Sequence, residues 1–148
     1  MSLNSNYFED YLLLAIVSPL KDYTLTFFMN KQLGLSLKKY DDLRISKKGG
    51  AYSWYYYKQD NKYVSCFLIG NNHSRQKLIP ALKDFDFFFL LKDVIDKEQL
   101  QLMASSIRKI QNVVGVFEQD MSAISGLDEL IERNELHEME QIISPAKK

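Results

Sequence analysis

The sequence has few features that would place the protein outside the cytosol. Cys66 is its single cysteine, so no disulfide can form within the chain. The longest apolar runs, residues 12–17 and 87–91, are far shorter than the ~20 residues that a membrane-spanning helix needs. The first ten residues have neither the basic segment nor the apolar segment of a secretory signal. We therefore expect a cytoplasmic protein that does not interact with membranes.

The chain also lacks net charge, with 19 basic and 19 acidic side chains. This balance gives no general attraction to nucleic acid. The charges are nevertheless unevenly distributed: residues 1–80 carry 11 basic and 6 acidic groups, and residues 81–148 carry 8 and 13. The two halves can attract each other, within one subunit or between two.

The common catalytic fingerprints are missing as well. The chain contains no G-x-G-x-x-G, G-x-x-x-x-G-K-[ST], G-x-S-x-G or H-E-x-x-H motif. His73 and His137 are far apart, and neither has a cysteine or histidine at ligand spacing. We therefore predict no enzyme, no metal site and no cofactor.

The composition is that of a folded globular protein. Hydrophobic residues make up 46% of the chain and charged residues 26%, which excludes global disorder. A chain of 148 residues is a common size for one domain. We expect a single domain over residues 1–148, with its core at about 8–120 and an acidic helical tail at about 121–148.

Two patterns predict the secondary structure, a continuous apolar or alternating rhythm for strands and a three-to-four-residue rhythm for helices. Ser18-Pro19 and Gly34 mark the ends of a first helix. Its expected packing face consists of Tyr23, Phe27 and Phe28, widened by Leu25, Met29 and Leu33. Asp96 is the expected cap of a second helix. The expected strands are 12–17, a bent strand within 35–45, 51–58, 62–69, 85–91 and 113–117, and the expected helices are 20–33, 100–110 and one that starts near 127.

This order predicts an α+β protein. Each of the first two helices connects strands of one sheet, so both helices should cover the same face and leave the other face open. We expect a two-layer ferredoxin-like sandwich with a mainly antiparallel sheet of about six strands. An extra hairpin and a peripheral C-terminal helix complete it.

One segment resembles a known family signature. Residues 79–87 read Ile-Pro-Ala-Leu-Lys-Asp-Phe-Asp-Phe and resemble the signature of the IPExxxVDY family of small bacterial proteins, with literal matches at Ile79, Pro80 and Asp86. Alanine, phenylalanine and phenylalanine stand at 81, 85 and 87, where the family has glutamate, valine and tyrosine. The first-helix patterns Asp-Tyr-x-Leu at 22–25 and Asn-Lys-x-Leu-Gly-Leu at 30–35 extend the resemblance to roughly residues 8–120. It implies a fold and a bacterial cytosolic setting, and no mechanism.

Several polar side chains are candidates for a site. Asp84 and Asp86 alternate onto one face, and paired carboxylates can act as acid and base, although charges at a strand end also discourage edge pairing. We expect Asp86 to accept backbone N–H groups from the loop around Pro80. Cys66 shares a strand face with apolar neighbours, as a buried structural thiol does. Ser18 and Asp22 lie at a helix N-terminus, where related two-layer folds hold amino-acid effectors.

Three aromatic residues at alternate positions, Tyr52, Trp54 and Tyr56, should share one face of the sheet. If exposed, they would form a stacking platform for RNA bases, as in the RNA-recognition motif. A subunit interface is the interpretation that we favour, because aromatics are enriched at association sites. The basic residues that would assist RNA binding are Lys38, Lys39, Arg44, Lys47 and Lys48.

The sequence therefore predicts a non-enzymatic interaction or regulatory module, with a homodimer as its expected form and another protein as a possible partner. A small-ligand sensor of the amino-acid type is the alternative. RNA binding through the aromatics and the basic patch ranks third, since nucleic acid is not the expected partner.

Overall fold

The computed structural model describes residues 10–45, 49–59, 64–73, 76–93 and 96–144. It is an α+β structure whose main sheet has six strands in the order β10-β1-β9-β6-β5-β2, and neighbouring strands within it pair antiparallel. Two short two-stranded sheets, β3-β4 and β7-β8, flank it. The strands of the main sheet are β1 (Tyr11–Val17), β2 (Lys38–Lys39), β5 (Trp54–Gln59), β6 (Val64–Gly70), β9 (Phe87–Lys92) and β10 (Gly115–Glu118).

The remaining elements connect and cover the sheets. The small strands are β3 (Leu43–Arg44), β4 (Ala51–Tyr52), β7 (Asn72–His73) and β8 (Gln76–Lys77). The α-helices are α2 (Asp22–Leu33), α3 (Lys97–Arg108) and α4 (Leu127–Glu138), and a π-helical turn, η3 (Met139–Ile143), extends α4. Two 3₁₀ turns, η1 (Pro80–Leu82) and η2 (Met121–Ala123), precede β9 and α4. None of the helices in these described segments is long and apolar enough to cross a membrane.

The expected hairpin is present. β5 and β6 pair antiparallel from Trp54 opposite Ile69 to Gln59 opposite Val64. The expected strand at 51–58 is divided at Ser53, so that Ala51 and Tyr52 pair with β3 instead. Asp96 caps α3 by accepting the N–H of Gln99 at 2.8 Å, as expected.

The start of α2 differs from the expectation. The helix begins at Asp22, and its N-cap residue Lys21 makes no side-chain capping hydrogen bond. Ser18 is used differently: its Oγ accepts the N–H of Leu20 at 3.1 Å and donates to the carbonyl of Asn112 at 2.8 Å. Gly34 ends the helix with φ +67°, the left-handed conformation that glycine adopts readily.

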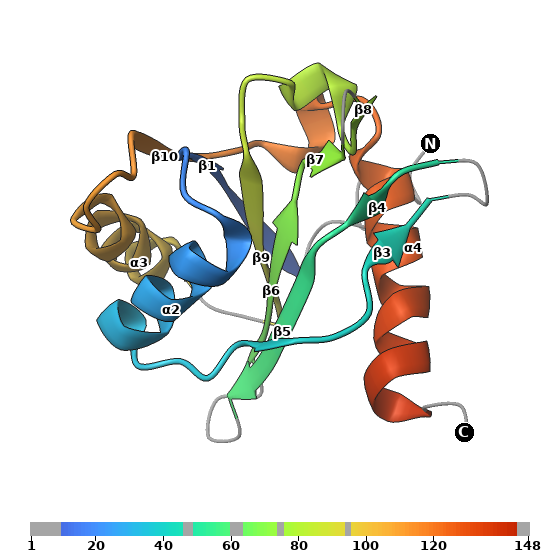
Figure 1. The fold of residues 1–148 in the computed structure, drawn as a ribbon, viewed down its shortest axis with the longest axis horizontal. Coiled ribbons are helices and arrows are strands. Elements are labelled where there is room, and N and C mark those ends of the chain that lie inside the picture. Colours follow the sequence, from blue (N-terminus) through green and yellow to red (C-terminus); the bar gives the residue numbers. More distant parts are fainter. Residues whose placement is uncertain (1–9, 46–48, 60–63, 74–75, 94–95, 145–148) are drawn as a thin grey trace.

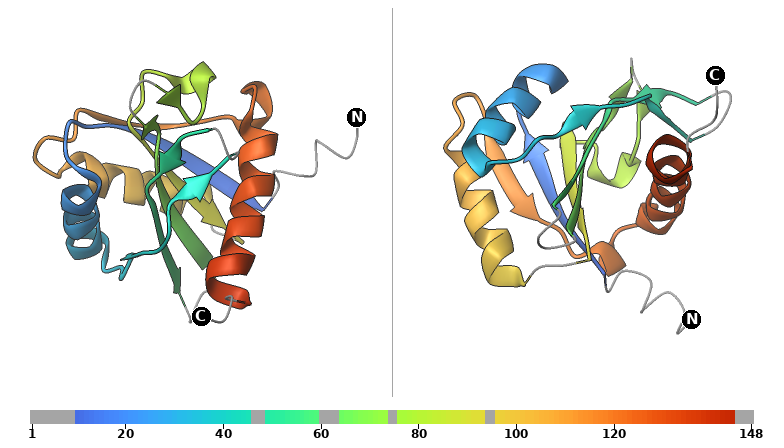
Figure 2. Two further views of the ribbon diagram at one scale, coloured as in Figure 1. Left: turned by 45° about the vertical axis from the view of Figure 1, so that its right-hand side comes forward. Right: turned by 90° about the horizontal axis from the view of Figure 1, so that it is seen from below.

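The sheet is covered on both faces, so the expectation of two layers with one open face is wrong. Buried residues of α2 and α3 form one core with alternate residues of the sheet, and buried residues of α4 form a second core on the opposite face. Figures 1 and 2 show α2 and α3 on one side of the sheet and α4 on the other. Leu127, Leu130 and Ile131 are buried, so α4 is part of the core and is not peripheral.

Burial on both faces explains the apolar runs in the sequence. Leu13 and Ala15 of β1 belong to the α4 core, whereas Leu14 and Ile16 belong to the α2–α3 core. A strand buried on both sides needs apolar residues at every position, which a sheet with one solvated face does not. The same alternation holds in β6 and β9.

The expected packing face of α2 is wrong in part. Leu25 and Met29 are buried against the sheet, and Tyr23, Phe27 and Phe28 are exposed. The helix carries apolar residues around most of its circumference, so the spacing alone does not identify the buried side.

Candidate functional site

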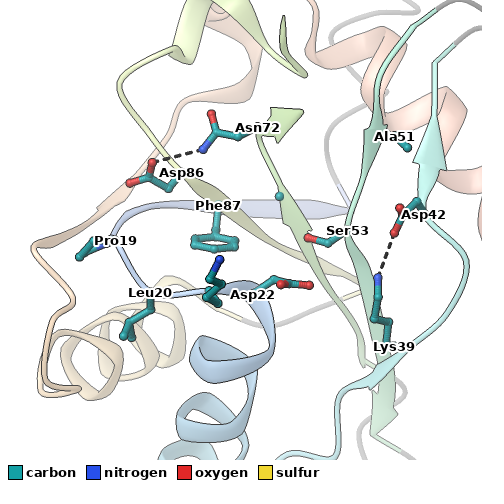
Figure 3. Close-up of a pocket in the computed structure, with 12 residues that line it drawn as sticks. Pro19, Leu20, Asp22, Lys39, Asp42, Ala51, Ser53, Asn72, Asp86 and Phe87 are labelled. Carbon is teal, nitrogen blue, oxygen red and sulfur yellow. Dashed lines mark hydrogen bonds and ion pairs between the residues drawn. The ribbon is translucent and has the colours of Figure 1, made fainter. Parts of the chain in front are cut away.

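A pocket of about 530 Å³ opens at one end of the sheet, beside the N-terminus of α2. Five chain segments line it: the turn between β1 and α2, residues 39–42 of β2 and the turn after it, residues 51–53 before β5, residues 70–72 at the end of β6, and the start of β9. The lining residues are Pro19, Leu20, Lys21, Asp22, Lys39, Asp42, Ala51, Ser53, Gly70, Asn72, Asp86 and Phe87. Figure 3 shows Asp86 and Asp22 on either side of the Phe87 ring.

Asp86 joins two of these segments. Its Oδ2 accepts the backbone N–H of Ser18 at 2.9 Å, and its Oδ1 accepts from Asn72 Nδ2 at 3.4 Å. The expected partner, the loop around Pro80, is not the one observed. The backbone N–H of Asp86 also donates to the carbonyl of Ile16. Asp86 therefore holds the turn after β1 against the start of β9.

Asn71, which the sequence interpretation missed, fixes the loop around Pro80. Its buried amide donates to the carbonyls of Leu82 and Phe85 and accepts the N–H of Ile79. Asparagine side chains commonly satisfy backbone groups in tight turns. The Gly-Asn-Asn sequence at 70–72 is the signal in the sequence that indicates such a turn.

Asp22 is the second carboxylate of the pocket. Its Oδ2 accepts from the hydroxyl of Tyr55 at 2.8 Å. Burial raises the pKa of the Tyr55 hydroxyl, and the hydrogen bond to Asp22 raises it further. Tyr55 thus remains a donor that fixes the orientation of Asp22.

The first turn of α2 supplies backbone donors. The N–H groups of Thr24 and Leu25 both donate to the carbonyl of Lys21. Because the first N–H groups of a helix have no intrahelical acceptor, those of Asp22 and Tyr23 have no hydrogen-bond partner among the described residues. Lys21 and Asp22 line the pocket, so the Lys21 side chain and the Asp22 N–H give this end of it a positive character.

The opposite wall contains a closed ion pair. Lys39 Nζ lies 2.9 Å from Asp42 Oδ1 and 5.3 Å from the centroid of the Tyr55 ring. Because these two charges are paired with each other, Lys21, Asp22 and Asp86 are the lining charges without an ionic partner among the described residues.

The three sheet aromatics lie on the other face and are buried by their own chain. Trp54 Nε1 donates to Asn134 Oδ1 of α4 at 2.7 Å, and the His137 ring meets Trp54 edge-on with centroids 4.6 Å apart. Tyr52 and Tyr56 are buried in the same core. An exposed stacking platform for RNA and a sheet-face subunit interface, both expected of these residues, are therefore wrong.

The other expected residues are dispersed. Ser18 is buried next to the pocket without lining it, and Asp84 is exposed outside it. Lys38 and Arg44 are exposed on β2 and β3, and Lys47 and Lys48 lie outside the described residues. Among the expected residues, the structure brings together Asp22, Asp86 and Lys39 in one pocket.

Cys66 is fully buried on the same face as Val64 and Leu68, which confirms the expectation of a structural thiol. Burial raises the pKa of this thiol to about 12. In the segments that the structure describes, no group of three or more histidine, cysteine, aspartate and glutamate side chains could hold a metal ion.

Comparison with known proteins finds no counterpart. No protein-family model, curated protein or solved structure matches this chain.

Proposed function

We propose that the protein is a non-enzymatic regulatory module that binds a small zwitterionic ligand, such as an amino acid, in the pocket at the N-terminus of α2. One observation carries this proposal: groups of both charge signs converge on a single pocket of about 530 Å³. This volume lies within the range of roughly 300–1,000 Å³ that is usual for small-molecule sites.

The arrangement of the charges defines the ligand class. The unpartnered N–H groups of the first turn of α2, together with Lys21, suit a carboxylate. Asp22 and Asp86 suit an ammonium group, because each carboxylate has lone pairs beyond those that its protein donors use. Leu20 and Phe87 provide apolar surface for the part of the ligand between the two charges.

The two carboxylates also favour binding over catalysis. Asp86 accepts from Ser18 and Asn72, and Asp22 accepts from Tyr55, so both act as fixed hydrogen-bond acceptors within the fold. Fixed acceptors of this kind orient a ligand at little cost in conformational entropy.

A thermal-shift series with the twenty amino acids tests this function. A ligand at 100 times its dissociation constant adds about 2.7 kcal/mol of stability, which corresponds to a rise in Tm of roughly 5–11 °C. We expect Lys21→Glu to abolish the rise, because it places an anion beside the ligand's carboxylate. Lys83→Glu is the matched control, because Lys83 is equally exposed and does not line the pocket.

Asp86→Asn should also remove the response, and Asp84→Asn should keep it. Asp86→Asn also alters the hydrogen bond to Ser18. The decisive comparison is therefore between Lys21→Glu and Lys83→Glu. If no amino acid raises the Tm, or if Lys21→Glu and Lys83→Glu respond equally, the proposed function is wrong.

We propose a ferredoxin-like plan for the fold. The order β10-β1-β9-β6 supports it. α3 links β9 to β10, which lie two positions apart, and the segment from α2 to β5 lies between β1 and β6, which are also two positions apart, with β5 and β2 added at one edge. Membership of the IPExxxVDY family is likewise a proposal. It is supported by the roles of the matching residues: Ile79 is buried, Pro80 opens a 3₁₀ turn, and Asp86 holds the turn after β1. Both proposals agree with a bacterial, cytoplasmic setting.

Homodimer formation stays a prediction, but pairing through a sheet edge is an unfavourable route to it. At the β10 edge the Arg108 guanidinium donates to the carbonyl of Val116 at 2.6 Å. At the other edge, β2 has two residues, both exposed lysines. Short, charged or covered edges discourage the addition of strands.

A further inference from the structure

The outer face of α2 is an unusual helix surface for solvent. Tyr23 is 64% exposed and Phe27 is 60% exposed, and Phe28 lies beside Phe27 with the two rings edge to face. Lys31 follows Phe27 by four residues, so Tyr23, Phe27 and Lys31 form one stripe along the helix. This α2 stripe points away from the core that contains Leu25 and Met29.

The outer face of α4 and η3 is a second such surface, with acidic flanks. Leu136, Met139 and Ile143 are 50%, 52% and 68% exposed. Glu132 and Glu140 lie four residues before and four residues after Leu136, so they border the same stripe, and both are exposed. We call these five residues the α4 stripe.

We infer that the α2 stripe of one molecule packs on the α4 stripe of a second copy of this chain. The two stripes are complementary: one combines aromatic rings with a lysine, and the other combines aliphatic side chains with glutamates. The charge of the whole chain follows the same division: residues 1–80, which include α2, are basic overall, and residues 81–148, which include α4, are acidic overall. Helix-on-helix packing of this kind would cover the five exposed apolar side chains of the two stripes at each contact.

The fold determines the symmetry of this association. α2 and α4 lie on opposite sides of the sheet, so a molecule cannot join its own two stripes (Figure 1). Each contact uses different surfaces on its two members, which makes the interface head-to-tail and leaves one free stripe at each end. The assembly therefore grows with concentration and does not stop at a closed dimer, so it differs from the homodimer that the sequence predicts.

The contact should be weak. A single helix-on-helix contact falls in the class of transient interfaces, below about 1,200 Å² of total buried area. We expect dissociation constants weaker than about 1 µM. The wild-type protein should then show a mass average that rises with concentration in sedimentation velocity.

Two blocked variants test the inference directly. Tyr23→Glu with Phe27→Glu blocks the α2 stripe, and Leu136→Lys with Met139→Lys blocks the α4 stripe. All four positions are exposed, so both variants should fold, which circular dichroism and Tm would check. Each variant alone should be monomeric at every concentration, whereas an equimolar mixture should form a discrete 1:1 dimer through the one intact pair of stripes.

Leu102→Glu serves as the control, because Leu102 is 64% exposed on α3 and belongs to neither stripe; this variant should associate as the wild type does. The inference is overturned if the mixture of blocked variants stays monomeric. It is equally overturned if the wild type is monomeric at all concentrations, or if it stops at a closed dimer. These measurements use no ligand, so their results do not depend on whether the pocket binds one.

Discussion

The two faces of the central sheet differ in how deeply their polar contacts are buried. On the α2–α3 face, Leu25, Met29, Leu100 and Ile107 pack on the strands, and the hydrogen bonds from Tyr55 to Asp22 and from Arg108 to the Val116 carbonyl are only partly buried. The α4 face has an apolar core too, but its hydrogen bond between Trp54 and Asn134 is fully buried. Trp54 donates a hydrogen bond to Asn134, and the hydroxyl of Tyr11 donates one to Glu135. His137 Nε2 donates to the carbonyl of Asp41 at 2.7 Å, and Lys92 Nζ lies 3.7 Å from Glu138 Oε1.

The comparison shows two ways of fixing a helix on a sheet. Apolar packing is tolerant of small changes in position, whereas a buried hydrogen bond requires both partners in one geometry. A typical intramolecular hydrogen bond contributes about 1 kcal/mol net, and a buried group that loses its partner costs about 1–3 kcal/mol. The polar contacts therefore specify where α4 docks, and the apolar contacts supply most of its stability. Asn134 Nδ2 is buried without a partner, so this docking site is not fully satisfied.

The largest effect should come from deleting apolar volume on either face. Phe88 and Phe89 are fully buried neighbours in β9 that point to the α4 face and the α2–α3 face respectively. Substitution of either by alanine should lower the free energy of unfolding by about 3–5 kcal/mol. Urea denaturation would measure both. A cost below about 1 kcal/mol for Phe88→Ala would contradict the assignment of the α4 face to the core.

A smaller effect is expected from the hydrogen bond between Trp54 and Asn134. Asn134→Leu leaves the indole N–H unpaired and should cost about 1–3 kcal/mol, whereas the double variant Trp54→Phe with Asn134→Leu should cost less than the two single changes combined. Urea denaturation followed by circular dichroism completes this double-mutant cycle. Arg133→Ala, on the exposed side of α4, should stay within about 0.5 kcal/mol of the wild type. Strict additivity would show that the bond does not couple α4 to the sheet.

The smallest effect concerns pH. Burial raises the pKa of Tyr56 to about 12, with Ser65 opposing the rise and Glu138 adding to it. A raised pKa means that the fold favours the neutral phenol, so this contribution to stability is complete below the unfolded value of 10.0 and is lost as the pH rises to about 12. Tyr56→Phe should therefore reduce the loss of stability between about pH 10 and pH 12, as followed by urea denaturation.

Tyr23→Phe is the control for this measurement, because it removes a tyrosine hydroxyl from an exposed position outside the core. Both variants retain Cys66, so its titration affects them equally. Equal slopes for Tyr56→Phe and the wild type would contradict the burial of the Tyr56 hydroxyl.

Much of the local structure could be predicted from the sequence. The hairpin of β5 and β6, the cap at Asp96 and the left-handed residue at Gly34 follow from short-range preferences, and the structure confirms them. The face of α2 could not be predicted. Apolar residues surround the helix, and only the positions of the strands decide that Leu25 and Met29 are buried while Phe27 is exposed.

The residues of the candidate site could also be predicted only in part, because some of them are brought together by the arrangement of the strands. Asp22 and Asp86 stand out as acidic residues at the ends of apolar segments. Ser53 and Asn72 gave no comparable signal, because their place in the pocket depends on where β5 and β6 diverge. Lys39 was noted only as part of a basic cluster, and its pairing with Asp42 beside the pocket depends on the path of the chain between β2 and β3.

By itself the sequence determined the α+β class, the antiparallel hairpin and the absence of an internal disulfide, since these depend on periodicity, turn chemistry and cysteine count within short stretches. Only the tertiary structure decided that α4 covers the second face of the sheet, burying Trp54 against Asn134, and that Asp22 and Asp86 line one pocket. The residues that form these contacts are far apart in the sequence. No short-range sequence pattern connects these residues. They come together because the free energy gained by burying both faces of the sheet exceeds the conformational entropy lost when α4 docks.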